Sequence, residues 1–261
     1  MVIGIVLAAL TAAVIFGGVH RVAKVSEIIV PIFAGLYILV SLFIVVTNLN
    51  YIPGVFKLIF ESAFGMREIA MGTMGGMMLT GIKRGLFSNE AGMGSTPHAH
   101  AVAKVNHPVE QGFVAMAGVF IDTFIVLNLT AFVILTTKSI PTGLTGAELS
   151  QYAFSTLYGK GGNIFIAICM FFFAFSTIIG WYFFGQANVK YLFGPKAVKI
   201  YSVLAACCVF LGSLAEVDLV WNMADCFNSL MVIPNILALF ALSKVISQVH
   251  KDYFKNFNKA K

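Results

Sequence analysis

Charged residues are scarce in this chain. Only 11% of its 261 residues are Asp, Glu, Lys or Arg, whereas 59% are hydrophobic. Polar side chains this few could not cover the surface of a water-soluble domain, so an ordinary soluble protein is excluded. The apolar runs are uninterrupted over about 20 residues, as a spanning helix requires, and lack the roughly ten-residue alternation of a membrane β-barrel. We therefore predict an all-α polytopic membrane protein.

Cysteine is also rare, and its placement argues against two kinds of site. The four cysteines show no CxxC or Cys–His spacing, so the sequence indicates neither a disulfide framework nor a zinc site. The enzyme motifs GxSxG and HExxH are missing as well, so neither an intramembrane enzyme nor an organic cofactor is indicated. We interpret the cysteines as small core residues: Cys169, Cys207, Cys208 and Cys226.

The basic residues lie between the apolar runs and in the tail. A net charge of +6 would suggest a nucleic-acid partner for a soluble protein. Here Lys and Arg gather in alternate connections, which predicts that those connections and the tail 244–261 are cytoplasmic. We therefore expect the lipid bilayer of the inner or plasma membrane, and no nucleic acid, as the partner.

Seven membrane passages are predicted, and together they make one transmembrane domain over residues 1–261. The first apolar run begins at Met1 with no polar leader, which predicts that the chain starts within a longer protein and not at a native N-terminus. The approximate passages are 1–19, 25–47, 69–104, 112–136, 162–187, 198–214 and 219–243.

Two shorter helices are predicted on the outer side, at about 54–66 and 145–158. In the first, Lys57 and Glu61 face away from an apolar stripe, which is typical of a helix that lies in the membrane interface. The stripe comprises Phe56, Ile59, Phe60, Ala63 and Phe64. The second opens with Thr145 and Glu148, the spacing of a capping box. It could be a lid over an outer vestibule or a helix packed on the outer face.

The passage 69–104 cannot be one continuous helix. It holds seven glycines and Pro97, and non-helical backbone at membrane depth is tolerated only where it is buried or lines a polar cavity. We place the break near 87–94, with Ser95 or Thr96 capping the second half-helix and Pro97 in its first turn. Carbonyls left unpaired near 85–87 and amides near 94–97 would suit a zwitterion together with a metal cation.

The break and a later passage supply the candidate site residues. Serine, asparagine and glutamate at the break have a reason to be buried if they line a binding site; alternatively, Glu90 pairs with Lys83 or Arg84 and Asn89 only satisfies loose backbone. The candidate substrate-binding residues are Phe87, Ser88, Asn89, Glu90, Gly92, Gly94, Ser95 and Trp181. Ser176 and Thr177 are candidate sodium ligands, unless each hydroxyl bonds the carbonyl one turn earlier.

Further polar residues in apolar runs are candidates for gating or for structural roles. Asp122 is an intramembrane carboxylate, which is costly unless paired, and Lys83 or Arg84 could be its architectural partner. Trp221, Asp225 and Asn228 fall on one face of the last passage, where gating and packing are both open.

The stretch GIKRGLFSNEAGMGS, followed by HPVEQG and GVFIDT, closely resembles the sodium:alanine/glycine symporters. The stretches FGGVHRVAKVSEIIVP and LMVIPNILALFALS resemble the same family, so the resemblance covers essentially the whole chain. It implies a LeuT-type fold of two inverted five-helix repeats that works by alternating access. It also implies a small neutral amino acid as substrate and sodium, in some members a proton, as coupling ion.

The resemblance also implies which part of that fold is present. The passages would correspond to core helices 4–10, with the broken passage as the sixth, and the first three core helices would be absent. The first core helix holds the substrate carboxylate and much of the sodium shell, so its absence leaves the exact amino acid and ion open. The chain is then the C-terminal part of a symporter or, alternatively, an inactive fragment or one piece of a split transporter whose N-terminal half is a partner. His98-Ala99-His100 departs from the family, but positions i and i+2 face different sides of a helix and do not suggest a metal site.

Overall fold

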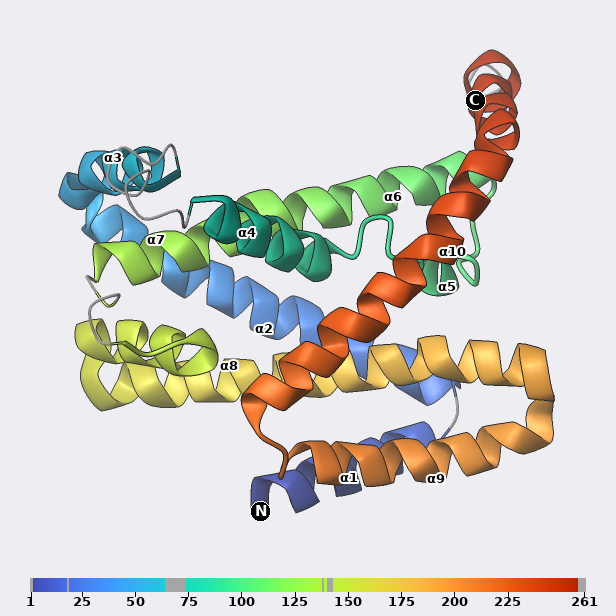
Figure 1. Ribbon diagram of the computed structural model, residues 1–261, viewed down its shortest axis with the longest axis horizontal. Helices are drawn as coiled ribbons and strands as arrows, with labels where there is room; N and C mark the ends of the chain where they lie inside the picture. The colour runs from blue at the N-terminus through green and yellow to red at the C-terminus, as the bar shows by residue number, and fades with distance from the viewer. Residues whose placement is uncertain (1, 18, 64–73, 138, 140–142, 258–261) are drawn as a thin grey trace.

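The computed structural model describes residues 2–17, 19–63, 74–137, 139 and 143–257 (Figure 1). Within these ranges every regular element is a helix, so the all-α prediction is confirmed. The α-helices are α1 (Val2–Ile15), α2 (Val19–Thr47), α3 (Ile52–Ala63), α4 (Met74–Asn89), α5 (Thr96–His100), α6 (Pro108–Phe120), α7 (Asn128–Thr136), α8 (Gly146–Phe193), α9 (Pro195–Gly212) and α10 (Val217–Asp252). A 3₁₀ turn, η1 (Leu49–Tyr51), and two π-helical segments, η3 (Ile121–Leu127) and η5 (Tyr253–Phe257), complete the described elements.

Five helical segments of the described chain are long and apolar enough to cross a membrane, as expected of a multi-pass membrane protein. They overlap five of the seven predicted passages: Arg21–Thr47, Pro108–Thr136, Gly146–Phe193, Pro195–Gly212 and Val217–Asn256. Helix α1 is apolar but only 14 residues long, and residues 74–100 are divided between α4 and α5. The count of seven passages stays a prediction.

Helix α8 is two helices joined at a glycine. Gly159 has φ 56° and ψ −135°, a conformation in which a side chain would be strained, so 146–158 and 160–193 are separate helical arms. Thr145 precedes the first arm, but its side chain makes no capping hydrogen bond, so the predicted capping box is wrong. We attribute this to Gly146, whose φ of 56° turns the backbone out of helical geometry directly after the cap.

A helix is found at the predicted place, as α3; its position on the outer side stays a prediction. Lys57 and Glu61 pair across one turn at 3.7 Å, and Phe56 packs edge-on against Phe132 of α7. Phe64 lies outside the described residues.

The largest apolar core joins α2, α7 and α8. At its edge the Tyr37 hydroxyl lies 2.6 Å from the Thr130 hydroxyl, so a buried polar group is satisfied between α2 and α7. A second core joins α1, α2 and α8. The buried members of the two cores are Tyr37, Ile44, Val133, Ala153, Phe154 and Ile166, then Val14, Val22, Phe175 and Ile179.

Helix α10 differs from these helices because it has no buried residue. It runs diagonally across the view in Figure 1, from the end of α9 to the C-terminal end of the described chain. At that end His107, which precedes α6, lies 3.5 Å from the Asp252 carboxylate and packs against the Tyr253 ring. The end of α10 is therefore joined to the start of α6.

Only one cysteine fits the predicted core role. Cys169 is buried, whereas Cys207, Cys208 and Cys226 are exposed, so the core interpretation is wrong for these three. They lie on faces of α9 and α10 that no other described helix covers.

Gly162 is predicted to be intolerant of a side chain. A Cβ added there would lie 2.2 Å from the Phe154 carbonyl oxygen, whereas one added at the neighbouring Gly161 meets nothing within 4 Å. Gly162→Ala should lower the free energy of unfolding by about 1–3 kcal/mol, because backbone would have to move. The matched Gly161→Ala should be neutral or stabilising by up to about 1 kcal/mol. Thermal unfolding in detergent measures both; equal melting temperatures for the two variants would contradict the packing.

Candidate functional site

The chain leaves helical geometry between the end of α4 at Asn89 and the start of α5 at Thr96. Three residues there have positive φ: Glu90 at 55°, Gly92 at 83° and Gly94 at 91°. Such values are rare outside glycine, so Glu90 is held in a strained conformation of the kind that gathers at functional sites. The segment lies within the predicted passage 69–104, at the place where the sequence predicts a break.

The strained loop is tied together by its own polar groups. The Ser95 hydroxyl donates to the Glu90 carboxylate at 2.6 Å, and the Ala91 amide donates to the Asn89 side-chain oxygen at 3.0 Å. Because Ser95 is engaged with Glu90, it does not cap α5, and Thr96 donates to the Glu90 carbonyl instead at 3.4 Å. The predicted cap at Ser95 or Thr96 is therefore wrong, and so is the alternative pairing of Glu90 with a basic residue of α4.

The carbonyl end of α4 is shifted from the predicted residues 85–87. Helix α4 continues to Asn89, and the Glu90 amide donates to the Leu86 carbonyl at 3.1 Å, so Leu86 is paired and the unpaired end begins no earlier than Phe87. Helix α5 has only five residues, with Pro97 in its first turn.

The last turn of α4 contacts the π-helical segment η3. The Ser88 hydroxyl donates to both Asp122 oxygens, at 3.1 and 2.9 Å, and the Asn89 amide donates to the Thr123 hydroxyl at 3.2 Å. π-Helical turns are rare and often mark functional sites, because the extra residue per turn redirects side chains. Asp122 therefore meets the break, and its predicted pairing with Lys83 or Arg84 is wrong because Arg84 is engaged elsewhere.

Arg84 joins α4 to α10. Its two terminal nitrogens lie 3.0 and 3.4 Å from the two Asp225 oxygens, and its guanidinium group lies 4.2 Å from the centre of the Trp221 ring. Phe87 packs against the same indole with ring centres 5.7 Å apart. The structure thus gathers two of the three predicted α10 residues. The side-chain nitrogen of the third, Asn228, is buried with no hydrogen-bond partner in the described part of the chain.

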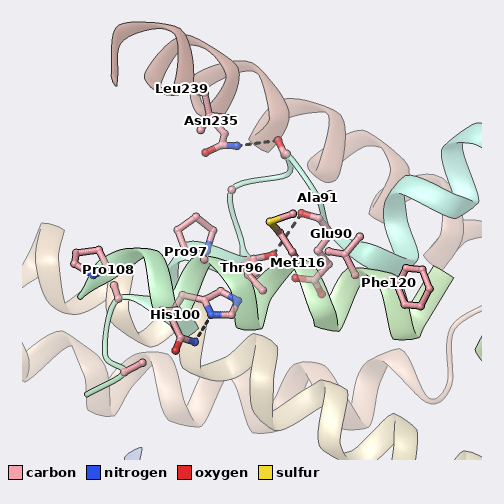
Figure 2. A pocket seen from close by; sticks show the side chains of 18 of the residues that line it. Glu90, Ala91, Thr96, Pro97, His100, Pro108, Met116, Phe120, Asn235 and Leu239 are labelled. Carbon is pink, nitrogen blue, oxygen red and sulfur yellow. Dashed lines mark hydrogen bonds between the residues drawn. The ribbon is translucent and has the colours of Figure 1, made fainter. Parts of the chain in front are cut away.

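A cavity of about 1020 Å³ lies between the break, α5, α6 and α10 (Figure 2). Of the predicted substrate-binding residues, Glu90, Gly92 and Gly94 line it. Phe87, Ser88, Asn89 and Ser95 belong to the same broken segment but are not among the lining residues. The rest of the wall is largely apolar and includes Pro97, Met116, Phe120 and Leu239.

Asn235 is a polar residue at this cavity that the sequence analysis did not name as a candidate. The Asn235 side-chain amide on α10 donates to the Gly92 carbonyl at 2.9 Å, and Figure 2 shows this contact as a dashed line between α10 and the loop. The sequence feature that could have identified Asn235 is a side-chain amide directly after Pro234 within an apolar run.

The candidate residues of α8 lie apart from this cavity. The Ser176 hydroxyl donates to the Phe173 carbonyl at 2.9 Å, which is the back-bonding alternative considered for it. Trp181 packs edge-on against Phe184, which in turn packs against the His98 ring of α5. Ser176, Thr177 and Trp181 are absent from the lining, so α8 reaches the broken segment through α5.

His98 and His100, which depart from the family pattern, have different hydrogen-bond partners. The His98 ring lies 2.9 Å from the Asn188 amide, and the His100 ring lies 2.6 Å from the Gln111 amide. No group of three or more His, Cys, Asp and Glu side chains that could hold a metal occurs among the residues the structure describes.

The pair of Arg84 and Asp225 is expected to stabilise the protein more than a surface pair does. The two side chains are 41% and 32% exposed, against 75% and 52% for Lys57 and Glu61. Arg84→Gln should lower the free energy of unfolding by about 2 kcal/mol, since it removes two charged hydrogen bonds and the contact with the indole. Lys57→Gln should cost less than about 0.5 kcal/mol. Thermal unfolding of the two variants compares them, and equal losses would refute the assignment.

Comparison with known proteins identifies the family of the chain. The sodium:alanine symporter family model matches residues 1–261. The amino-acid carrier protein AlsT of Bacillus subtilis is 45% identical over 98% of this chain and 55% of its own length. The probable sodium/glutamine symporter GlnT of B. subtilis is 42% identical over 97% of this chain and 53% of its own length. The sodium/alanine symporter AgcS of Methanococcus maripaludis is 41% identical, over 98% of this chain and 59% of its own length.

The chain spans about half the length of the curated relatives it matches. These relatives are named as carriers and symporters. The match covers the broken segment together with η3 and α10, which contact it. The chain belongs to the sodium:alanine symporter family, whose members are membrane transporters and not enzymes.

Proposed function

We propose that this chain carries part of the machinery for sodium-coupled symport of a small neutral amino acid, alanine or glycine, by alternating access. The observation that carries the proposal is the break between α4 and α5: the last turn of α4 contacts a π-helical segment, and the strained loop that follows contacts α10. Because the chain spans about half of its relatives, we assign to it this part of the site and not the whole transport cycle.

A broken helix can bind both ends of a zwitterion. The carbonyls at the end of α4 attract an ammonium group, and the amides at the start of α5 attract a carboxylate. In the proposed complex Ser88 and Asn89 would add polar side chains beside these backbone ends. Phe87 and Trp181 do not line the cavity described above, so they would limit the size of the substrate side chain, in favour of alanine or glycine, only in another state of the alternating-access cycle.

The coupling ion is proposed to bind on α8. The hydroxyls of Ser176 and Thr177 are hard oxygen donors of the kind that suits sodium, and in a LeuT-type fold this helix contributes such hydroxyls. We extend the proposal to that fold, with the described helices as core helices 4–10, and to a cytoplasmic C-terminus in the inner or plasma membrane. The Arg84 and Asp225 pair would act as a gate between α4 and α10.

Substrate should protect the break from chemical modification. In a background whose native cysteines are replaced, Ser88→Cys or Asn89→Cys should react with a polar thiol reagent because the break is proposed to line a water-accessible path. Alanine with sodium should slow the reaction. Thr156→Cys, at an exposed position of the first arm of α8, should react equally with and without alanine. If neither position at the break is reactive and protected, the binding-site assignment is lost.

Thr177→Ala should raise the sodium concentration for half-maximal uptake more than it raises the KM for alanine. The reason is that sodium has only a few oxygen ligands, so the loss of one directly weakens the binding of sodium. Ser176→Ala provides a comparison, because the Ser176 hydroxyl already donates to the Phe173 carbonyl. The measurement is alanine uptake against sodium concentration in cells that depend on this transporter. An unchanged sodium dependence in both variants would remove the sodium site from α8.

A further inference from the structure

The side chain of Asn235 touches the broken segment in two ways. Its amide nitrogen donates to the Gly92 carbonyl at 2.9 Å, as the dashed line in Figure 2 shows. Its Cβ and Cγ also lie only 3.0 and 3.2 Å from where a Cβ on Gly94 would be. The same side chain therefore fixes one loop carbonyl and packs closely against the next loop glycine.

This contact acts on a segment whose backbone conformation is energetically unfavourable. Glu90, Gly92 and Gly94 all have positive φ, and a backbone in this state persists only when its surroundings over-determine it. The Gly92 carbonyl also needs a fixed hydrogen-bond donor to keep one orientation, because Gly92 is exposed and water alone would leave the carbonyl free to turn. Asn235 supplies that donor from a different helix.

Helix α10 also holds the chain on the other side of the break. Asp225 and Trp221 bind Arg84, which lies in α4 before the break, whereas Asn235 binds Gly92 after α4 has ended. Ten positions along α10 correspond to about 15 Å at a rise of 1.5 Å per residue. Since α10 has no buried residue, its place against the broken segment depends strongly on these directional contacts.

We propose that Asn235 is a positioning residue for transport: it does not bind the substrate but sets the orientation of the Gly92 carbonyl and hence the shape of the loop that does. This inference rests on the proposed function. It adds to that function a requirement on α10, namely that an uncharged hydrogen-bond donor stands at position 235.

The test replaces the amide by a group of the same shape that cannot donate. In Asn235→Asp the ionised carboxylate should repel the Gly92 carbonyl, so hydrogen–deuterium exchange of the purified protein should increase in the peptide that covers residues 86–96. The KM for alanine should rise about tenfold while kcat changes less, because one hydrogen bond that shapes the site is lost. At a pH low enough to protonate the new carboxyl group, which can then donate, the ratio of variant to wild-type KM should fall toward one.

Two companion variants separate positioning from general damage. Asn222→Asp makes the same chemical change at an exposed position of α10 and should leave exchange and KM unchanged. Asn235→Ala introduces no charge and should raise both exchange and KM, with no recovery at low pH. It provides the test if the aspartate variant does not fold.

Normal exchange and normal KM in both variants at position 235 would overturn the inference. If wild-type cells that make this chain show no sodium-dependent alanine uptake, the proposed function fails, and the exchange measurement still decides the role of Asn235.

Discussion

The need to satisfy backbone hydrogen bonds within a membrane governs this structure. A continuous helix meets that need by itself, but the segment between Asn89 and Thr96 does not, since three of its residues have left-handed φ values. Side chains supply the missing partners: Asn89 accepts from a loop amide, and Thr96 and Asn235 donate to loop carbonyls. Three of the polar residues at the break are thus explained by the needs of its backbone, whereas Arg84, Ser88 and Ser95 pair with other side chains.

The helices are held together in two different ways. Helices α2, α7 and α8 share a buried apolar core, and α1 joins α2 and α8 in a second one. The contacts described for α4 with η3 and α10 are instead hydrogen bonds, an ion pair and a ring contact, formed by partly exposed side chains. Apolar packing resists sliding over a broad area, whereas a few directional bonds can be exchanged for others. Under the proposed alternating access, α4 and α10 are therefore the elements expected to move against the firmer group of helices.

Much of this arrangement could be predicted from the sequence, because membrane helices follow from apolar length. The glycines and Pro97 located the break to within a few residues, and the spacing of Trp221 and Asp225 placed both on one face of α10. The partners of the polar residues could not be predicted. Charge complementarity assigned Arg84 to Glu90 or Asp122, but the fold gives it Asp225 and gives Asp122 a neutral hydroxyl from Ser88. Asn235 was missed because a single amide in an apolar run has no periodic signal.

The C-terminal helix is attached at three widely spaced points: Asp225 to Arg84, Asn235 to Gly92, and Asp252 to His107. Adding or deleting one residue between two of these points would rotate the remainder of the helix by about 100° and shift it by about 1.5 Å. All contacts beyond the change would then face the wrong direction at once. Single substitutions between the points can be absorbed locally, because much of the surface of α10 is exposed. The helix can therefore vary in composition far more readily than in length.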